Sequence, residues 1–190
     1  DQDPIKTKRL ILTPLKAKQL AQLEQEEQDE LLRGAIIEMR NKVSETFDQA
    51  LWNTGWQITL KNGGQPIGLL GFHGAAVDQT VELGYDIKQE FRGNGYCQEA
   101  VKALCDWAFG CDGVYFISVL VPEHNAASNH VLEKLKFYRV ESPVAGVTAW
   151  EIERHASAWT SIYMIFGVAL GISFGQTLFR NMAVGLAIGI

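Results

Sequence analysis

The stretch EFRGNGYCQEAVKAL, Glu90–Leu104, places two glycines, separated by one residue, directly in front of a helical pattern. Gly93 and Gly95 can adopt positive φ, and a turn built from them leaves the first backbone N–H groups of the helix free to contact a ligand. The helix dipole and the guanidinium of Arg92 add positive charge at the same place. The stretch therefore predicts an anion site suited to a pyrophosphate, although a turn between strand and helix also uses glycine for geometry alone.

The helix behind the glycines is predicted from the spacing of its apolar residues. We expect it to start at the glycines and to run for about four turns. Cys97 lies where the helix dipole would favour a thiolate, but its place in the apolar stripe favours packing. The buried stripe is expected to contain Cys97, Ala100, Val101, Leu104, Cys105 and Ala108, whereas Gln98, Glu99, Lys102 and Asp106 are expected to face water.

Strands and helices on both sides of this stretch are predicted from periodicity and turn signals. The charged region Lys16–Val43 is expected to form two helices, with Gly34 as the weak point. Asn125 fits the N-cap of a later helix that ends near Leu135. This order predicts an α+β fold with several antiparallel strands rather than a strictly alternating parallel sheet. The strands are expected at Ile5–Thr13, Trp56–Leu60, Gln65–Phe72, Val81–Ile87, Val114–Val121, Phe137–Glu141 and Thr148–Glu153.

Composition narrows the classes of function. The chain of 190 residues has a formal net charge of −5 and so lacks a general attraction for nucleic acid, whose backbone favours basic surfaces. Its three cysteines, Cys97, Cys105 and Cys111, have neither the number of a disulfide framework nor the spacing of a metal site. We expect a reducing, cytoplasmic compartment, no metal and no nucleic-acid partner.

Five segments, in the same order along the chain, resemble the GNAT superfamily of N-acetyltransferases, in particular its branch of ribosomal-protein N-terminal (Rim-type) acetyltransferases. The resemblance extends from Ile5 to about Arg154. It implies a mixed, mostly antiparallel GNAT-like sheet flanked by helices, and acetyl-CoA as the co-substrate. The segments are TKRLILTPL (Thr7–Leu15), IGLLGFHG (Ile67–Gly74), VELGYDI (Val81–Ile87), EFRGNGYCQEAVKAL and NAASNHVLEKLKF (Asn125–Phe137).

The resemblance also implies which residues bind acetyl-CoA. The turn Arg92–Tyr96 would hold the pyrophosphate through backbone amides, and the pantetheine would lie as a pseudo-strand beside Gly84–Ile87. Asn125 would contact the pantetheine, with helix capping as its alternative role. The expected cofactor-binding residues are Tyr85, Asp86, Ile87, Arg92, Gly93, Asn94, Gly95, Tyr96, Asn125 and Ser128.

Three positions depart from the family's pattern. Glu90 stands where Gln or Arg is frequent, so that Arg92 would have to supply the charge for the phosphate. Lys136 replaces a glycine after the last helix, and a less tight turn is expected there. Leu132 occupies the position of a tyrosine that many members have, so the Rim-type serine, matched by Ser128, is the expected hydroxyl.

Acetyl transfer to an amine needs a base, a donor for the thioester carbonyl and a proton for the leaving thiolate. A lysine-like amine is mostly protonated at neutral pH, and Glu82 is the expected base, with a solvated residue on the polar face of a strand as the alternative. Backbone N–H groups near Tyr85–Ile87 would hold the carbonyl oxygen. Ser128 would hydrogen-bond the departing sulfur, unless its hydroxyl only serves the first helical turn. His73 and His124 are further candidate bases, although a lone histidine is more often structural.

Residues 156–190 form a separate segment by composition. No charged residue occurs from Ala156 to Phe179, and Gly167, Gly171 and Gly175 recur every four positions. This pattern favours an apolar helical tail that associates with a membrane, with the catalytic part on the cytoplasmic face; burial against protein, as in self-association or a homodimer, is the alternative. We therefore expect an acetyltransferase domain at 1–155 and a hydrophobic tail at 156–190.

The sequence predicts an acetyl-CoA-dependent N-acetyltransferase that transfers the acetyl group directly to a primary amine. Two other classes stay open: an acyl-CoA-binding module with weak catalysis, suggested by Glu90 and Leu132, and a membrane-tethered scaffold. The amine acceptor is not defined by these residues, so protein N-termini, aminoglycosides and small metabolites all remain candidates.

Overall fold

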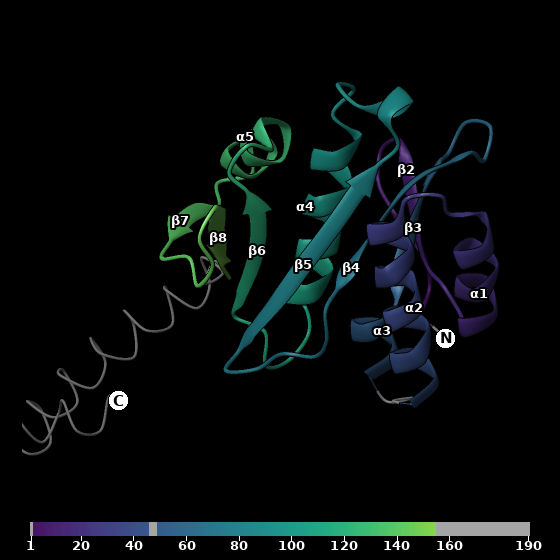
Figure 1. Cartoon of the computed structure of the whole chain (residues 1–190), viewed down its shortest axis with the longest axis horizontal. Coiled ribbons are helices and arrows are strands. Elements are labelled where there is room, and N and C mark those ends of the chain that lie inside the picture. Colours follow the sequence, from purple (N-terminus) through teal and green to yellow (C-terminus); the bar gives the residue numbers. More distant parts are fainter. Residues whose placement is uncertain (1, 46–48, 155–190) are drawn as a thin grey trace, which may run out of the picture. The chain divides into compact units, whose positions relative to one another are not determined.

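An eight-stranded sheet is the framework of the part of the chain that the computed structural model describes, residues 2–45 and 49–154 (Figure 1). The strand order is β1-β2-β3-β4-β5-β6-β8-β7, and the neighbouring pairs are antiparallel except for β5 with β6. The predicted α+β fold with a mixed, mostly antiparallel sheet is therefore confirmed. The strands are β1 (Ile5–Lys6), β2 (Leu10–Pro14), β3 (Gly55–Leu60), β4 (Pro66–Phe72), β5 (Thr80–Ile87), β6 (Phe116–Pro122), β7 (Tyr138–Val140) and β8 (Val147–Glu153).

The central strands β5 and β6 pair over a short stretch only. Thr80–Glu82 lie opposite Phe116–Ser118, and beyond this point the two strands diverge, with α4 (Tyr96–Phe109) visible behind the gap (Figure 1). On its other edge, β5 stays paired with β4 as far as Ile87. The sheet therefore opens on one side of β5 while β4 holds the other side in place.

Helices cover both faces of the sheet. α4 buries the predicted apolar stripe in the main core, where it packs with the large side chains Trp56 and Phe72. α1 (Ala17–Glu26) and α2 (Glu30–Glu45) pack against each other and, through a smaller core, against Leu69 of β4. Leu69 and Leu70 belong to different cores because successive strand residues point to opposite faces. The remaining helical elements are α3 (Ala50–Asn53), η2 (Gln89–Phe91) and α5 (Ala126–Lys134).

The predicted N-terminal strand Ile5–Thr13 is two short strands instead of one. A turn at Thr7–Arg9 separates β1 from β2, and the two strands then pair with each other as a hairpin. The Thr7 hydroxyl accepts a hydrogen bond from the Leu10 N–H at 2.9 Å, and the Thr7 N–H donates to the Leu10 carbonyl at 3.0 Å. A threonine side chain that bonds to the nearby backbone in this way replaces strand pairing by a turn.

The two helices expected within Lys16–Val43 are present, but the break between them is not at Gly34. Gly34 lies inside α2, and the chain turns instead between Glu26 and Glu30. There the Asp29 carboxylate accepts a hydrogen bond from the Leu32 N–H at 3.0 Å, as an N-cap does. An acidic cap therefore outweighs the weak helix propensity of glycine as the boundary signal.

The turn after α5 is closed, although Lys136 was expected to loosen it. Lys136 adopts a φ of 68°, the left-handed conformation that glycine accepts most readily. The Phe137 N–H donates to the Leu132 carbonyl at 3.0 Å across the turn. Lys136 thus adopts the left-handed conformation typical of glycine, although its Cβ atom makes this conformation less favourable.

The predicted tail at 156–190 lies outside the residues that the structure describes. Its membrane association, its self-association and its role as a separate domain stay predictions. Among the described residues, none of the helices combines the length and the apolar character needed to cross a bilayer.

Candidate functional site

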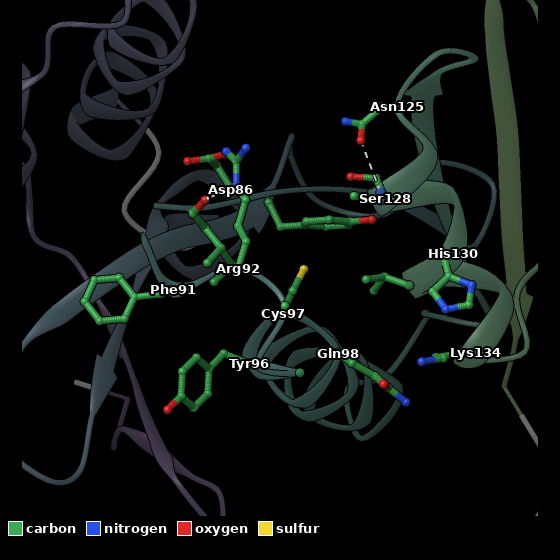
Figure 2. A pocket seen from close by; sticks show the side chains of 16 residues that line it. Asp86, Phe91, Arg92, Tyr96, Cys97, Gln98, Asn125, Ser128, His130 and Lys134 are labelled. Atoms are coloured by element: carbon green, nitrogen blue, oxygen red, sulfur yellow. Dashed lines mark hydrogen bonds and ion pairs between the residues drawn. The ribbon is translucent and has the colours of Figure 1, made fainter. Parts of the chain in front are cut away.

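A pocket of about 340 Å³ lies where β5 and β6 diverge, and we call it the α4–α5 pocket. Its walls are the end of β5, the glycine turn, the first turn of α4 and one face of α5 (Figure 2). Asn94 lies in the glycine turn but outside the lining, and Glu82 is also outside it. The structure brings together in this lining nine of the predicted site residues: Tyr85, Asp86, Ile87, Arg92, Gly93, Gly95, Tyr96, Asn125 and Ser128.

The glycine turn has the backbone geometry that its sequence predicts. Gly93 and Gly95 have φ values of 78° and 75°, in the left-handed region that disfavours other residues. Gly95 is the N-cap of α4, and its carbonyl accepts the helical hydrogen bond from the Glu99 N–H at 3.1 Å. The N–H groups of Tyr96, Cys97 and Gln98, the three residues between Gly95 and Glu99, lie at the positive end of the helix dipole, where an anion is favoured. Asn94 holds the turn together through hydrogen bonds from its side chain to two turn carbonyls.

A brace from the β1–β2 turn fixes the glycine turn from outside. The Arg9 side chain donates to the Asn94 carbonyl at 2.9 Å and to the Glu99 carboxylate at 2.7 Å. The guanidinium also lies over the Tyr96 ring, 4.5 Å from its centroid. Thr7 donates to the same Glu99 carboxylate at 2.6 Å. We call this set of four contacts the Arg9 brace.

Glu99 was predicted to face water, and this is wrong. Its side chain is only 18 % exposed because it receives the hydrogen bonds of the Arg9 brace. Partial burial by itself would raise the pKa of Glu99, but the hydrogen bonds from Thr7 and Arg9 outweigh it and hold the pKa below the usual range. The carboxylate is therefore charged and paired at neutral pH.

Arg92 forms an ion pair with the neighbouring Asp86 carboxylate. Its guanidinium donates to the Ile87 carbonyl at 2.7 Å and to the Asp86 carboxylate at 3.2 Å, which ties the turn to the end of β5 (Figure 2). The side chain is still 58 % exposed. Arg92 therefore positions the turn as well as carrying charge, a second role that its sequence context did not indicate.

Two further basic side chains line the opposite wall and were missed by the sequence reasoning. His130 and Lys134 belong to α5 and border the pocket (Figure 2). Helical spacing could have found them, because Ala127, Val131 and Lys134 repeat on one face and also line the pocket. Lys134 adds a positive charge across from Arg92.

The start of α5 is held by the predicted cap. The Asn125 carbonyl oxygen of the side chain accepts a hydrogen bond from the Ser128 N–H at 3.2 Å (Figure 2). Asn125 is thus the N-cap, and the Ser128 hydroxyl is not needed for that role. Leu132, which replaces the family's tyrosine, is completely buried in the core.

Two groups inside the pocket are neutral because they are buried. Cys97 extends from the first turn of α4 toward the middle of the pocket, and burial raises its pKa to about 12 (Figure 2). A thiolate at the helix start is therefore disfavoured. Burial also raises the pKa of Tyr85, while the neighbouring Ser128 side chain partly offsets the rise. The Tyr85 hydroxyl is buried and forms no ordinary hydrogen bond within the described residues.

Glu82 lies outside the pocket, on the other side of β5. Its side chain is 40 % exposed and contacts the imidazole of His73, with 3.1 Å between Oε1 and Nδ1. His73 and Glu82 are cross-strand neighbours, because the His73 N–H donates to the Glu82 carbonyl at 2.9 Å. His73 was treated as a lone histidine from the sequence, but in the structure it is paired with Glu82.

Comparison with known proteins agrees with this architecture. The chain is 32 % identical over 85 residues to YoaA and 30 % identical over 102 residues to YjdG, both from Bacillus subtilis and described as uncharacterized N-acetyltransferases. These alignments cover 44 % and 53 % of this chain. They span about half the length of the relatives, 48 % and 57 %.

Solved structures share the fold at lower identity. An acetyltransferase from Agrobacterium tumefaciens superposes with a TM-score of 0.61 at 21 % identity, over 80 % of this chain and 95 % of that chain. RimL, the ribosomal L7/L12 α-N-protein acetyltransferase solved with coenzyme A, gives 0.61 at 17 % identity, over 80 % and 98 %. The family model of the acetyltransferase (GNAT) domain matches residues 9–138, which include β2 and extend to the start of β7. Because this match covers more than half of the sequence, the chain belongs to the GNAT acetyltransferase family.

Proposed function

We propose that this chain is an acetyl-CoA-dependent N-acetyltransferase that moves the acetyl group directly to a primary amine, without a covalent enzyme intermediate. The observation that carries this proposal is the α4–α5 pocket. It combines a glycine turn at a helix start with an open edge of β5. Such a turn suits a pyrophosphate, and an open strand edge suits an extended, amide-containing chain.

The lining fits acetyl-CoA in charge and in hydrogen-bonding groups. The backbone N–H groups at the start of α4 would bind the pyrophosphate, with Arg92 and Lys134 supplying charge from two sides. The open edge of β5 offers main-chain groups near Tyr85–Ile87 to the amides of the pantetheine. The buried hydroxyl of Tyr85 forms no ordinary hydrogen bond within the described part of the chain, which fits a site that a polar ligand completes.

The proposed chemistry needs two protons to be moved. An ammonium acceptor first loses a proton to a base beside β5, where Glu82 contacts His73, and this gives the neutral amine that attacks the thioester carbonyl. Backbone N–H groups of β5 stabilise the developing oxyanion. As the carbon–sulfur bond breaks, the second amine proton ends on the thiolate, and the Ser128 hydroxyl hydrogen-bonds the sulfur. Positioning of both reactants supplies the rest of the rate enhancement.

The acceptor is proposed to be a primary amine of a protein N-terminus or of a small molecule. The first class is supported by the fold shared with RimL, which acts on the N-terminus of a ribosomal protein. A panel of acceptors separates the two classes: peptides beginning with Ser or Ala, a polyamine and an aminoglycoside. Preference for the peptides would place this chain with the Rim-type branch.

The decisive test measures release of the CoA thiol with this panel and, in parallel, CoA binding by calorimetry. We expect turnover with at least one amine class and CoA binding that competes with acetyl-CoA. CoA binding without turnover would instead favour an acyl-CoA-binding module, for which Leu132 and the Arg92–Asp86 pair are the supporting observations. Loss of both binding and turnover would contradict either function.

The role of the tail is tested separately. We propose that residues 156–190 attach the enzyme to a membrane on its cytoplasmic face, or else mediate self-association. Partition of the full chain and of a chain ending at Arg154 between membrane and aqueous fractions separates these roles, with sedimentation to measure the oligomeric state. If both chains partition equally and have the same oligomeric state, both proposed roles of the tail are contradicted.

A further inference from the structure

The His73–Glu82 pair lies on the face of β5 that also carries Asp86, a residue of the α4–α5 pocket lining, while Tyr85 lines the pocket from the other face. Side chains alternate along a strand, so Glu82, Gly84 and Asp86 share one face and Tyr85 points to the other. The pair is also located where β5 and β6 stop pairing, at Glu82 opposite Ser118. A group held in the pocket and a group beside His73 would therefore meet at the same break in the sheet.

Gly84 provides the space that the His73 ring occupies. A Cβ atom at position 84 would lie 3.0 Å from Nε2 of His73, closer than ordinary carbon–nitrogen contact. Nε2 is therefore the ring atom nearest to the backbone of β5 at Gly84, next to the residue that begins the pocket lining. A larger residue at position 84 would push the imidazole away from the strand.

The second ring nitrogen makes the contact with Glu82. Because Nδ1 is 3.1 Å from the Glu82 carboxylate, the favoured tautomer of the neutral ring carries its proton on Nδ1. Nε2 is then the nitrogen with a free lone pair. A carboxylate that holds an imidazole in this way fixes its orientation and stabilises the imidazolium once it forms.

The surroundings of the ring carry charges of both signs. Glu38 and Lys42 of α2 form an ion pair at 2.6 Å, and the Lys42 ammonium lies 3.4 Å from the His73 carbonyl oxygen. A small cavity of about 70 Å³ separates α2 from His73 and is bordered by both of these residues. With Glu82 on β5, carboxylates face the imidazole from two elements, which favours the approach of a cationic amine.

We propose that His73 is the catalytic base and that Glu82 is the residue that positions it; this inference rests on the proposed acetyl transfer. An ammonium acceptor enters from the α2 side and gives one proton to Nε2 of His73. The neutral nitrogen then forms the bond to the acetyl carbon as the carbon–sulfur bond breaks. The second amine proton ends on sulfur, and His73 returns its own proton to water.

The kinetic test compares His73→Gln and Glu82→Gln with the wild type over a range of pH. We expect His73→Gln to lower kcat/KM by about 100-fold near neutral pH, within the usual range for loss of a general base. The deficit should shrink as pH rises toward the pKa of the amine, which is about 8 for a protein N-terminus and about 10 for a lysine-like amine. Glu82→Gln should have a smaller effect, and the double variant should be no worse than His73→Gln alone, because Glu82 acts through His73.

Controls separate the base from its surroundings and from the proposed function. CoA affinity should be unchanged in His73→Gln, and Asp112→Asn, a change at an exposed residue in the α4–β6 loop, should keep full activity. Wild-type rates in His73→Gln at every pH, or a larger loss in Glu82→Gln than in His73→Gln, would overturn the assignment of the base. A wild-type chain that acetylates no amine would contradict the proposed function as well.

A spectroscopic readout tests the pair without relying on turnover. The chain has four histidines, so its imidazole ¹⁵N signals can be assigned by single substitutions. We expect neutral His73 to show the Nδ1–H tautomer in the wild type and to lose that preference in Glu82→Gln. An Nε2–H tautomer in the wild type would overturn the proposed geometry even if the enzyme is active.

Discussion

The two walls of the α4–α5 pocket are held by contacts of different range. The glycine turn is attached to the β1–β2 turn by Arg9, which contacts Asn94 across 85 residues and Glu99 across 90. The opposite wall begins with a local cap, in which Asn125 binds the N–H of a residue three positions later. Beyond its cap, α5 contacts the sheet through the Trp150 indole, which donates to Asn129 at 2.8 Å, and through the ion pair of Glu133 with Arg139 at 3.6 Å.

Long-range contacts fix where a wall lies relative to the sheet, whereas local contacts fix only the conformation within that wall. The Arg9 brace fixes where the glycine turn lies relative to the sheet, so disturbing it should displace the donors that face a ligand. The Asn125 cap only orders the first turn of α5, so its loss should fray that turn and leave the rest of the helix packed. Substitutions on the two walls should therefore divide into effects on ligand affinity and effects on stability.

The largest expected effect follows from reversing the charge on the braced wall. Arg92→Glu removes the bonds to Asp86 and Ile87 and leaves two carboxylates side by side at the proposed pyrophosphate site. We expect CoA affinity to fall by about 100-fold, the scale of a lost charge-assisted hydrogen bond with added repulsion. Calorimetric titration with CoA measures this change. Arg33→Glu, on the exposed side of α2, is the matched control and should bind normally. Unchanged affinity in Arg92→Glu would show that the pyrophosphate binds elsewhere.

The Arg9 brace should contribute to stability in a pH-dependent way. Glu99→Gln removes the charge that receives Thr7 and Arg9, and we expect the free energy of unfolding to fall by about 1–3 kcal/mol at neutral pH. The folded pKa of Glu99 is below its unfolded value, so this stability is fully present above the unfolded pKa. It is lost as pH falls through the folded pKa. Urea unfolding at several pH values should show the two proteins converging in acid.

The matched control for this change lies on the same helix. The Asp106 carboxylate forms an ion pair with Lys102 at 2.6 Å, and both side chains are more than 60 % exposed. Asp106→Asn should therefore change stability by at most about 0.5 kcal/mol. An equal loss in Asp106→Asn and Glu99→Gln would mean that helix charge, and not the Arg9 brace, accounts for the effect.

The locally capped wall should respond more weakly. Asn125→Ala removes the acceptor for the Ser128 N–H, which costs about 1 kcal/mol for an N-cap. Asn125→Asp keeps the acceptor and should restore stability, so the pair separates capping from other roles of the amide. We expect hydrogen exchange to speed up in the first turn of α5 only. If CoA affinity falls in both variants while stability is restored in Asn125→Asp, the amide itself contacts the ligand.

The same distinction of range explains which features the sequence could predict. The left-handed glycines, the stripe of α4 and the Asn125 cap depend on neighbouring residues, so local patterns predicted them. The Arg9 brace joins segments far apart in sequence, and nothing near Glu99 signals its partner.

The His73–Glu82 pair was missed for the same reason. The two residues come together only once the register of β4 and β5 is known. Each was considered separately as a base, while their contact depends on a turn whose exact length the sequence pattern did not determine. The Asp29 cap, by contrast, is a local signal. It could have predicted the start of α2 from the sequence, in place of a weak point at Gly34.

The smallest expected effect concerns the side chain that spans the two walls. The Tyr85 hydroxyl comes from β5, lies beside the Ser128 side chain of α5 and has no ordinary hydrogen bond to any residue that the structure describes. A buried hydroxyl without a partner contributes no net stability, so Tyr85→Phe should leave the free energy of unfolding unchanged or raise it by up to about 1 kcal/mol. CoA should then stabilise the wild type more than the variant, because a polar ligand can satisfy the hydroxyl in the wild type alone. Thermal unfolding with and without CoA measures both quantities, and Tyr138→Phe, at an exposed tyrosine bonded to Glu151, is the control that should lack this ligand dependence. A loss of stability in Tyr85→Phe without CoA would mean that the hydroxyl already has a partner, and that the two walls are joined before any ligand binds.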